Sequence, residues 1–64
     1  MEIVININCD NAAFKDNESH EAARILRVLA LKIRDFDKLE STTYITAYDL
    51  NGNNVGYLAV VIRR

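Results

Sequence analysis

Hydrophobic and polar positions change their spacing along the chain, and each spacing predicts a different element. From Glu2 to Asn8 every second residue is isoleucine, which is typical of a strand with one buried face. From Asn17 to about Arg34 hydrophobic residues recur every three or four positions, which predicts a helix with one side in a core. The expected core side consists of Ala22, Ile25, Leu26, Leu29, Ile33 and Phe36.

Two further strands are expected in the second half of the chain. β-branched and aromatic residues favour a strand over Thr42–Leu50, and a second apolar run extends from Val55 to Ile62. Asn51-Gly52 between them predicts a hairpin turn, because both residues tolerate positive φ. The polar stretches Cys9–Asp16 and Asp35–Ser41 are expected to connect the elements.

A few residues are expected to fix the ends of the helix and of the core. Asn17 is placed to cap the first turn of the helix, and Glu21 puts negative charge near the positive end of its dipole. Phe14 is expected to anchor the first connection onto the core. Phe36 and Leu39 are expected to close one end of the core.

The order of elements predicts an α+β fold of the β-α-β-β type, with a three-stranded sheet and one helix packed on one face. A right-handed crossover through the helix sets the first two strands parallel, and the hairpin sets the third antiparallel to the second. The last strand is apolar at nearly every position from Leu58 to Ile62, which favours a central place and the strand order 1-3-2. The alternative order, 1-2-3, would leave that strand on an exposed edge.

Strict alternation in the strands then divides the sheet residues between its two faces. The residues expected to point toward the helix are Ile3, Ile5, Ile7, Ile45, Ala47, Leu58, Val60 and Ile62. Those expected to point away are Val4, Asn6, Tyr44, Thr46, Tyr48, Tyr57, Ala59 and Val61. The second face is therefore expected to be uncovered and rich in tyrosine.

Apolar side chains on two outer surfaces indicate contact with other molecules. The candidate binding residues are Tyr44, Tyr48, Tyr57 and Val61 on the sheet and Val28 and Leu31 on the helix. Three interpretations are open: ordinary surface tyrosines, a homodimer through the sheet or its edge, and a stacking platform for single-stranded nucleic acid. The last is the weakest, because the basic residues expected near this face are only Arg63, Arg64 and Lys15.

Length and cysteine content favour self-association. A chain of 64 residues buries only about 60% of its unfolded surface, so its stability is expected to be marginal without a partner. The single cysteine, Cys9, cannot form an internal disulfide, and with His20 alone it cannot build a structural zinc site. We therefore expect a homodimer.

Charge and hydropathy narrow the classes of partner and the location. Nine acidic and eight basic residues give a net charge of −1, which disfavours nucleic acid and anionic membranes as partners. The first ten residues lack the basic start and continuous apolar stretch of a signal peptide, and no segment has the roughly 20 apolar residues needed to span a bilayer. We expect a protein of the cytoplasm with no membrane partner.

Each apparent chemical motif is incomplete. His20 begins an HExxH-like segment that ends in Arg24, so the second zinc ligand is missing. Asp49 begins a calcium-loop-like segment whose glycine comes too early and which has Val60 in place of the bidentate glutamate. Cys9 and His20 lack features that would activate a thiol. We expect no enzymatic activity and no cofactor.

Three segments carry a resemblance to a known family: ININCDNAAFKDN, EAARILRVLALKI and DLNGNNVG. They resemble very short, mostly uncharacterised proteins of tailed phages and prophages, which share an NAAF-x-D-N turn, an E-x-A-R-I-L helix and a D-x-N-G-N-x-V-G hairpin. The matching motifs are structural, and no catalytic residue carries over. Val28 and Leu31 stand where charged residues are expected in such proteins, which favours a partner-binding helix face in this chain.

The resemblance implies an accessory protein of a phage, working in the cytoplasm of the host cell. Small phage proteins without enzymatic motifs often act by occluding or remodelling a host protein. Inhibition of a host defence system, including an anti-CRISPR role, is an expectation by analogy.

Overall fold

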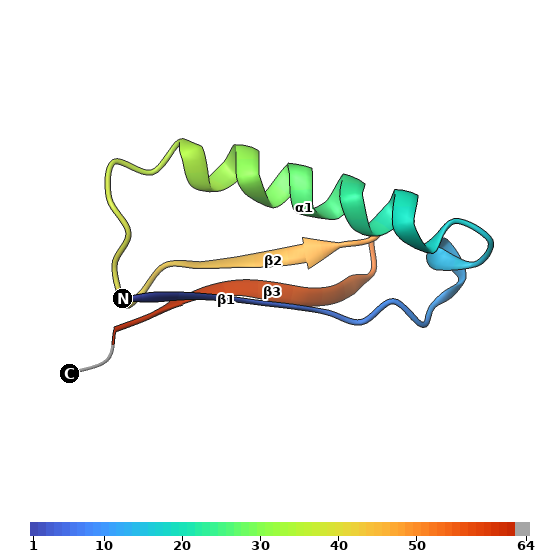
Figure 1. The fold of residues 1–64 in the computed structure, drawn as a ribbon, viewed down its shortest axis with the longest axis horizontal. Helices are drawn as coiled ribbons and strands as arrows, with labels where there is room; N and C mark the ends of the chain where they lie inside the picture. Colours follow the sequence, from blue (N-terminus) through green and yellow to red (C-terminus); the bar gives the residue numbers. More distant parts are fainter. Residues whose placement is uncertain (63–64) are drawn as a thin grey trace.

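The computed structural model describes residues 1–62 and contains three strands, one long helix and one short 3₁₀ turn (Figure 1). The elements are β1 (Glu2–Ile7), η1 (Ala12–Phe14), α1 (Glu18–Arg34), β2 (Tyr44–Tyr48) and β3 (Asn54–Val61). The expected helix end at Arg34 is confirmed. The bounds of β1 and β3 lie within one residue of the expected runs, and β2 is two residues shorter than expected at each end.

The sheet has the strand order β1-β3-β2, as the apolar composition of the last strand predicted. β3 pairs antiparallel with both neighbours, so β1 and β2 run in the same direction. The α+β fold with one helix on a three-stranded sheet is thereby confirmed. β1 and β2 form the two edges of the sheet.

The core lies between α1 and the sheet face that α1 covers (Figure 1). Its buried residues are Phe14, Ile25, Leu29, Ile45, Ala47, Val55 and Leu58. Phe14 is only 1% exposed, so the expectation that it anchors the first connection is confirmed. Val60 is also buried, near the end of β3.

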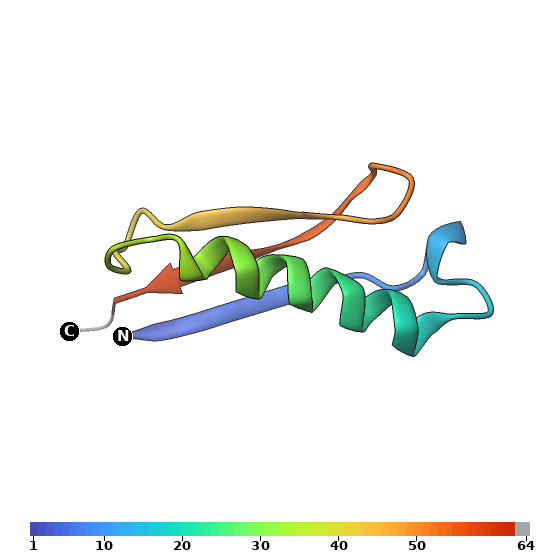
Figure 2. The ribbon, with the colours of Figure 1, turned by 90° about the horizontal axis from the view of Figure 1, so that it is seen from above.

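The expected burial of β1 is wrong for most of the strand. Ile3 and Ile5 are 46% and 44% exposed, and Ile7 is only half-buried. Seen from above, α1 crosses the sheet obliquely, with its first turns toward the end of β1 and its last turns toward the start of β2 (Figure 2). The first half of β1 is therefore left uncovered, and Ile62, beyond the end of β3, is also exposed.

Two of the residues placed on the core side of the helix are exposed instead. Leu26 lies on the flank of α1 rather than on the line of Ile25 and Leu29, and it is largely exposed. Phe36 is 44% exposed, because α1 ends before it and the helical periodicity no longer applies. Leu39 is half-buried, so neither Phe36 nor Leu39 closes the core as expected.

The start of α1 differs from the expected capping arrangement. Asn17 occupies the N-cap position, but its side chain makes no capping hydrogen bond. Its backbone, at φ −144° and ψ 38°, departs from the extended conformation in which a cap side chain reaches the first-turn amides. The asparagine that does cap is Asn11, whose side chain accepts a hydrogen bond from the amide of Ala13 at the start of η1.

Candidate protein-interaction surface

The face of the sheet opposite α1 is uncovered by the described chain and carries the tyrosines. Figure 1 shows α1 on one side of the sheet and no other part of residues 1–62 on the opposite side. Tyr44 and Tyr48, on β2, are 59% and 50% exposed. Tyr57 and Val61, on the central strand β3, are half-buried. All four predicted sheet residues thus have solvent-accessible surface.

Two of these tyrosines form a pair. The rings of Tyr44 and Tyr57 stack with centroids 5.6 Å apart and an interplanar angle of 16°. The pairing of Tyr44 with Ala59 and of Thr46 with Tyr57 makes the two rings diagonal neighbours on one face, within reach of each other. A stacked pair is restrained before any partner arrives, so it presents a preformed apolar surface.

This face offers little to a phosphate backbone. Within the described strands, Glu2 is the single charged residue. Lys15, one of the basic residues considered for nucleic acid, lines a depression together with the acidic Asp10, Asp16 and Glu18. Arg63 and Arg64, the other two, lie outside the described residues.

The helix candidates lie on the other side of the molecule. Val28 and Leu31 are both exposed on α1. Val28 and Tyr48 line the same groove of about 110 Å³ between α1 and β2. The structure therefore brings Val28 close to one predicted tyrosine and separates Leu31 from the stacked pair.

A buried polar network joins the helix, the first connection and the hairpin. Glu21 is only 4% exposed and accepts two hydrogen bonds from Arg24, at 2.6 and 3.0 Å, and one from the Leu50 amide at 2.7 Å. Asp49, equally buried, accepts from Asn11 Nδ2 at 2.6 Å and from the Asn53 amide at 2.8 Å. It also accepts from the Asn51 amide and from Asn53 Nδ2.

Sequence reasoning missed both buried carboxylates. Glu21 was expected to place negative charge near the helix dipole and Asp49 to lie near the end of a strand, and neither was assigned a buried position. A usable signal is present in the turn: an aspartate followed by asparagines two and four residues later can accept hydrogen bonds from its own turn, as Asp49 does from Asn51 and Asn53. The burial of Glu21 has no such local signature.

The polar groups of this network are satisfied within the chain. Every buried side-chain nitrogen and oxygen within residues 1–62 has a hydrogen-bond partner. The carboxylate of Glu21 accepts three of these hydrogen bonds and that of Asp49 accepts four, all from groups within the chain. What this arrangement does is hold the hairpin against the start of α1.

Hydrogen bonding lowers the pKa of both buried carboxyl groups. For Glu21 the hydrogen bonds from Arg24 lower the pKa most, against the opposing effect of burial. For Asp49 burial raises the pKa, and the combined hydrogen bonds from Asn53, Asn11 and Asn51 outweigh it. Both groups are thus charged in the folded protein at neutral pH.

These shifts predict loss of stability in acid. A carboxyl group with a lowered folded-state pKa contributes stability that is present above its ordinary pKa, about 4, and is lost as the pH falls through the folded-state pKa. The urea concentration at the midpoint of unfolding, measured by circular dichroism, is expected to stay constant between about pH 7 and pH 5. It is expected to decrease when the pH is lowered beyond about 4.

Replacing Asp49 with asparagine is expected to lower the midpoint at pH 7 and to flatten its fall in acid. In the wild type, Asn11 Nδ2 and Asn53 Nδ2 both donate to one carboxylate oxygen of Asp49. An asparagine side chain has only one oxygen, so its amide nitrogen would face donors and hydrogen bonds would be lost. Asp37→Asn, at an exposed position, is the matched control and should keep the wild-type profile. An Asp49→Asn profile parallel to wild type would refute a role for this carboxylate in the pH dependence.

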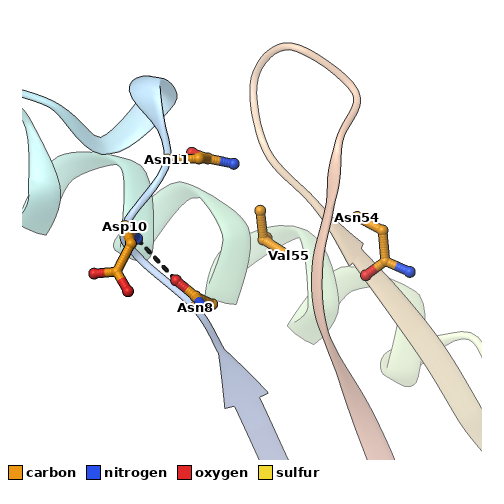
Figure 3. A pocket seen from close by; sticks show the side chains of 5 residues that line it. All are labelled: Asn8, Asp10, Asn11, Asn54 and Val55. Carbon is orange, nitrogen blue, oxygen red and sulfur yellow. Dashed lines mark hydrogen bonds between the residues drawn. The ribbon is translucent and has the colours of Figure 1, made fainter.

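A depression of about 370 Å³ lies between the end of β1 and the start of β3 (Figure 3). Asn8, Asp10, Asn11, Asn54 and Val55 line it. Several of the polar groups are already engaged: Asn8 Oδ1 accepts from the Asp10 amide, and Asn54 Oδ1 accepts from the Gly56 amide. Within residues 1–62 no group of three or more histidine, cysteine, aspartate or glutamate side chains is placed to hold a metal ion.

Cys9 and His20 are not joined by a hydrogen bond in the described residues. Cys9 is half-buried, with its Sγ 3.9 Å from the carbonyl oxygen of Ile7, and it packs against the core. His20 is exposed in the first turn of α1.

Comparison with known proteins gives no match: no family model, no curated protein and no solved structure is significantly similar to the chain. Within residues 1–62, α1 and the rest of the helical structure are too short or too polar to cross a membrane.

Proposed function

We propose that this chain is a non-enzymatic accessory protein of a phage or prophage, and that it acts by binding another protein through the tyrosine-bearing face of its sheet. The residues in contact with the partner are Tyr44, Tyr48, Tyr57 and Val61. Val28 and Leu31 on α1 form a second, smaller candidate surface, which reaches the first surface only through the groove shared by Val28 and Tyr48.

The observation that carries this proposal is the exposure of two tyrosines on a sheet face that no other part of residues 1–62 covers. Tyrosine is among the residues that contribute most to protein interfaces, because its ring is large, rigid and amphipathic. Tyr44 is additionally held in place by its stacking on Tyr57. A partner that covers this face buries apolar rings without having to order them first.

Charge supports a protein partner over a nucleic acid. A face that stacks on bases works together with basic side chains that bind phosphates. The described strands contribute Glu2 and no basic residue to the sheet. A partner surface of apolar and polar uncharged groups fits this face better than an anionic strand.

The resemblance to short phage proteins supports a host protein as the target. A chain of this size acts most simply by covering a functional surface of a larger protein. Host defence proteins, among them CRISPR effectors, are the class that we propose first, by analogy.

Affinity capture tests the proposal. Tagged wild-type protein and the variants Tyr44→Ala and Tyr48→Ala are expressed in infected host cells, and the retained proteins are identified by mass spectrometry. A partner that binds the sheet face should be retained by wild type and lost from both variants. In titrations with the purified partner we expect about tenfold or greater weakening, since truncating an interface tyrosine commonly costs this much.

Arg27→Ala, on the exposed side of α1, is the matched control and should bind as wild type does. Loss of binding in Leu31→Ala, with Tyr44→Ala and Tyr48→Ala unaffected, would move the site to the helix. Salt-sensitive binding of single-stranded oligonucleotides would favour a nucleic-acid partner instead. Equal retention by wild type and every variant would refute both protein surfaces.

A further inference from the structure

The outer edge of β1 is an open strand edge, and we propose that a second copy of this chain pairs with it. In this homodimer the two β1 strands run antiparallel and join two three-stranded sheets into one continuous sheet. The proposal concerns self-association only, and it stands apart from whatever protein binds the tyrosines.

The pairing register shows which backbone groups of β1 face outward. The amide of Asn8 donates to the carbonyl oxygen of Val55, its opposite residue on β3, at 2.8 Å. Hydrogen-bonded pairs alternate in an antiparallel ladder, so Asn6 with Tyr57 and Val4 with Ala59 also exchange hydrogen bonds with β3.

The N–H and C=O groups of the intervening isoleucines, Ile3, Ile5 and Ile7, therefore point away from β3. No strand of residues 1–62 lies on that side, because β1 is at the end of the sheet order. The carbonyl oxygen of Ile7 has a long contact of 3.9 Å with Cys9 Sγ. The remaining outward groups form a row that another extended strand would pair with.

The two edges of the sheet differ in their protection. On the outer edge of β2, Arg24 Nη2 donates to the carbonyl oxygen of Tyr48 at 3.2 Å. The pairing of β2 with β3 also shifts register between Ala47 and Tyr48, where the extra residue, Val55, lies on β3. β1 pairs with β3 without a bulge over its full length and contains neither proline nor lysine. Bulges, prolines and charged side chains are how monomeric proteins keep a strand edge from pairing, and β1 lacks them except for Glu2 at its start.

The side chains at the same positions are apolar and uncovered. Ile3 and Ile5 point to the helix side of the sheet, but α1 does not cover them, and they are 46% and 44% exposed. Leu26 is exposed on the flank of α1 away from Val28, and since Val28 lines the groove beside β2, Leu26 lies on the β1 side. A second copy would close this apolar strip with an identical one.

A two-fold axis through Ile5 makes β1 self-complementary. It places Ile5 opposite Ile5 of the second copy and Ile3 opposite Ile7, so every outward ladder position meets another one. The same register sets Glu2 opposite the uncharged Asn8, and no like charges face each other across the axis. The backbone ladder accepts any extended strand, so the argument for a second copy rests on its side chains, which set isoleucine opposite isoleucine and no like charges opposite each other.

The axis stands perpendicular to the sheet, so both helices remain on one face. The tyrosines of the two copies then share the opposite face, on one continuous sheet. The apolar residues Ile3, Ile5 and Leu26 of one copy then face the same residues of the other copy in the groove between the two helices.

Mass measurement by light scattering across a concentration series tests the dimer. Wild type is expected to have about twice the monomer mass of 7.3 kDa at high micromolar concentration. Ile5→Lys places two like charges on the axis and should weaken the dimer by about tenfold or more. Leu31→Lys, the same change at an exposed helix position away from the edge, should leave the mass at the dimer value.

A synthetic chain with an N-methyl group on Ile5 tests the backbone pairing itself. The methyl group removes an outward N–H and leaves the bonds to β3 in place, so the fold should persist by circular dichroism while the mass falls to that of a monomer. This variant also covers the case in which Ile5→Lys fails to fold.

A monomeric wild type, or a dimer unchanged by both Ile5 modifications, would overturn the proposal. These outcomes are separate from those of the partner-binding test. Tyr48→Ala should lose its partner and keep the dimer mass, and Ile5→Lys should lose the dimer with its tyrosines intact.

Discussion

Replacing Phe14 with alanine is expected to remove most of the stability of this domain. Phe14 is 1% exposed and packs in the same core as Ile25 and Leu29 of α1. Truncating a buried phenylalanine costs about 3–5 kcal/mol. A domain of this length has a total stability of about 3–10 kcal/mol, at roughly 0.05–0.15 kcal/mol per residue. Urea unfolding followed by circular dichroism should show a midpoint close to zero denaturant.

Phe36→Ala is the matched control, because it deletes the same side chain from an exposed position. The expected loss is about 1 kcal/mol or less, as for most surface substitutions. The sequence predicts a core position for both phenylalanines, for Phe14 as the anchor of the first connection and for Phe36 from the helical periodicity, so this pair of variants tests the difference in burial that the structure shows. Equal losses at the two positions would contradict the arrangement in which η1, and not the segment after α1, anchors the core.

Replacing Gly56 with alanine is expected to disrupt the pairing of β1 with β3. A Cβ atom at Gly56 would lie 1.8 Å from the carbonyl oxygen of Asn6 and 2.9 Å from Cα of Ile7. Both are backbone atoms, so no side-chain rotation can relieve the clash, and β1 must move away. We expect a loss of about 1–3 kcal/mol or more in the free energy of unfolding. Amide exchange measured by NMR should show faster exchange at Asn6, which pairs with β3.

Gly52→Asn is the control for this substitution. Gly52 has φ +84° in the hairpin turn, and a Cβ atom added there would meet nothing within 4 Å. Asparagine tolerates this conformation better than other non-glycine residues, so the cost should be about 1 kcal/mol or less. If Gly52→Asn proved as damaging as Gly56→Ala, close approach of β1 and β3 would not be the reason that position 56 needs glycine.

The candidate interaction surface was largely predictable, because strand alternation is a local property. Once Tyr44 and Tyr48 are assigned to the face opposite Ile45 and Ala47, their exposure follows from the lack of a second covering layer in residues 1–62. The stacking of Tyr44 on Tyr57 needs the register between β2 and β3, which no local pattern specifies. The predicted order 1-3-2 already places β1 at an edge, but which of its backbone groups face outward is known only from its register with β3.

The buried network at Glu21 and Asp49 was not predictable for a different reason. Charged residues are almost never fully buried unless they are paired, and a sequence does not reveal the pair. Here the partners of Glu21 and Asp49 include Leu50 and Asn11, which are separated from them by 29 and 38 positions. Such contacts exist only after the hairpin has docked against the start of α1.

The sequence by itself determined the elements and their order, because periodicity and turn residues act over short distances. It also determined that the last strand is central and antiparallel to the strand before it, because an apolar run and a hairpin turn are local features. Tertiary structure alone decided how α1 lies across the sheet. That oblique placement leaves Ile3, Ile5 and Leu26 in contact with solvent although their spacing matches a core. The angle of a helix on a sheet depends on how all its side chains pack at once, and no stretch of the chain encodes it separately.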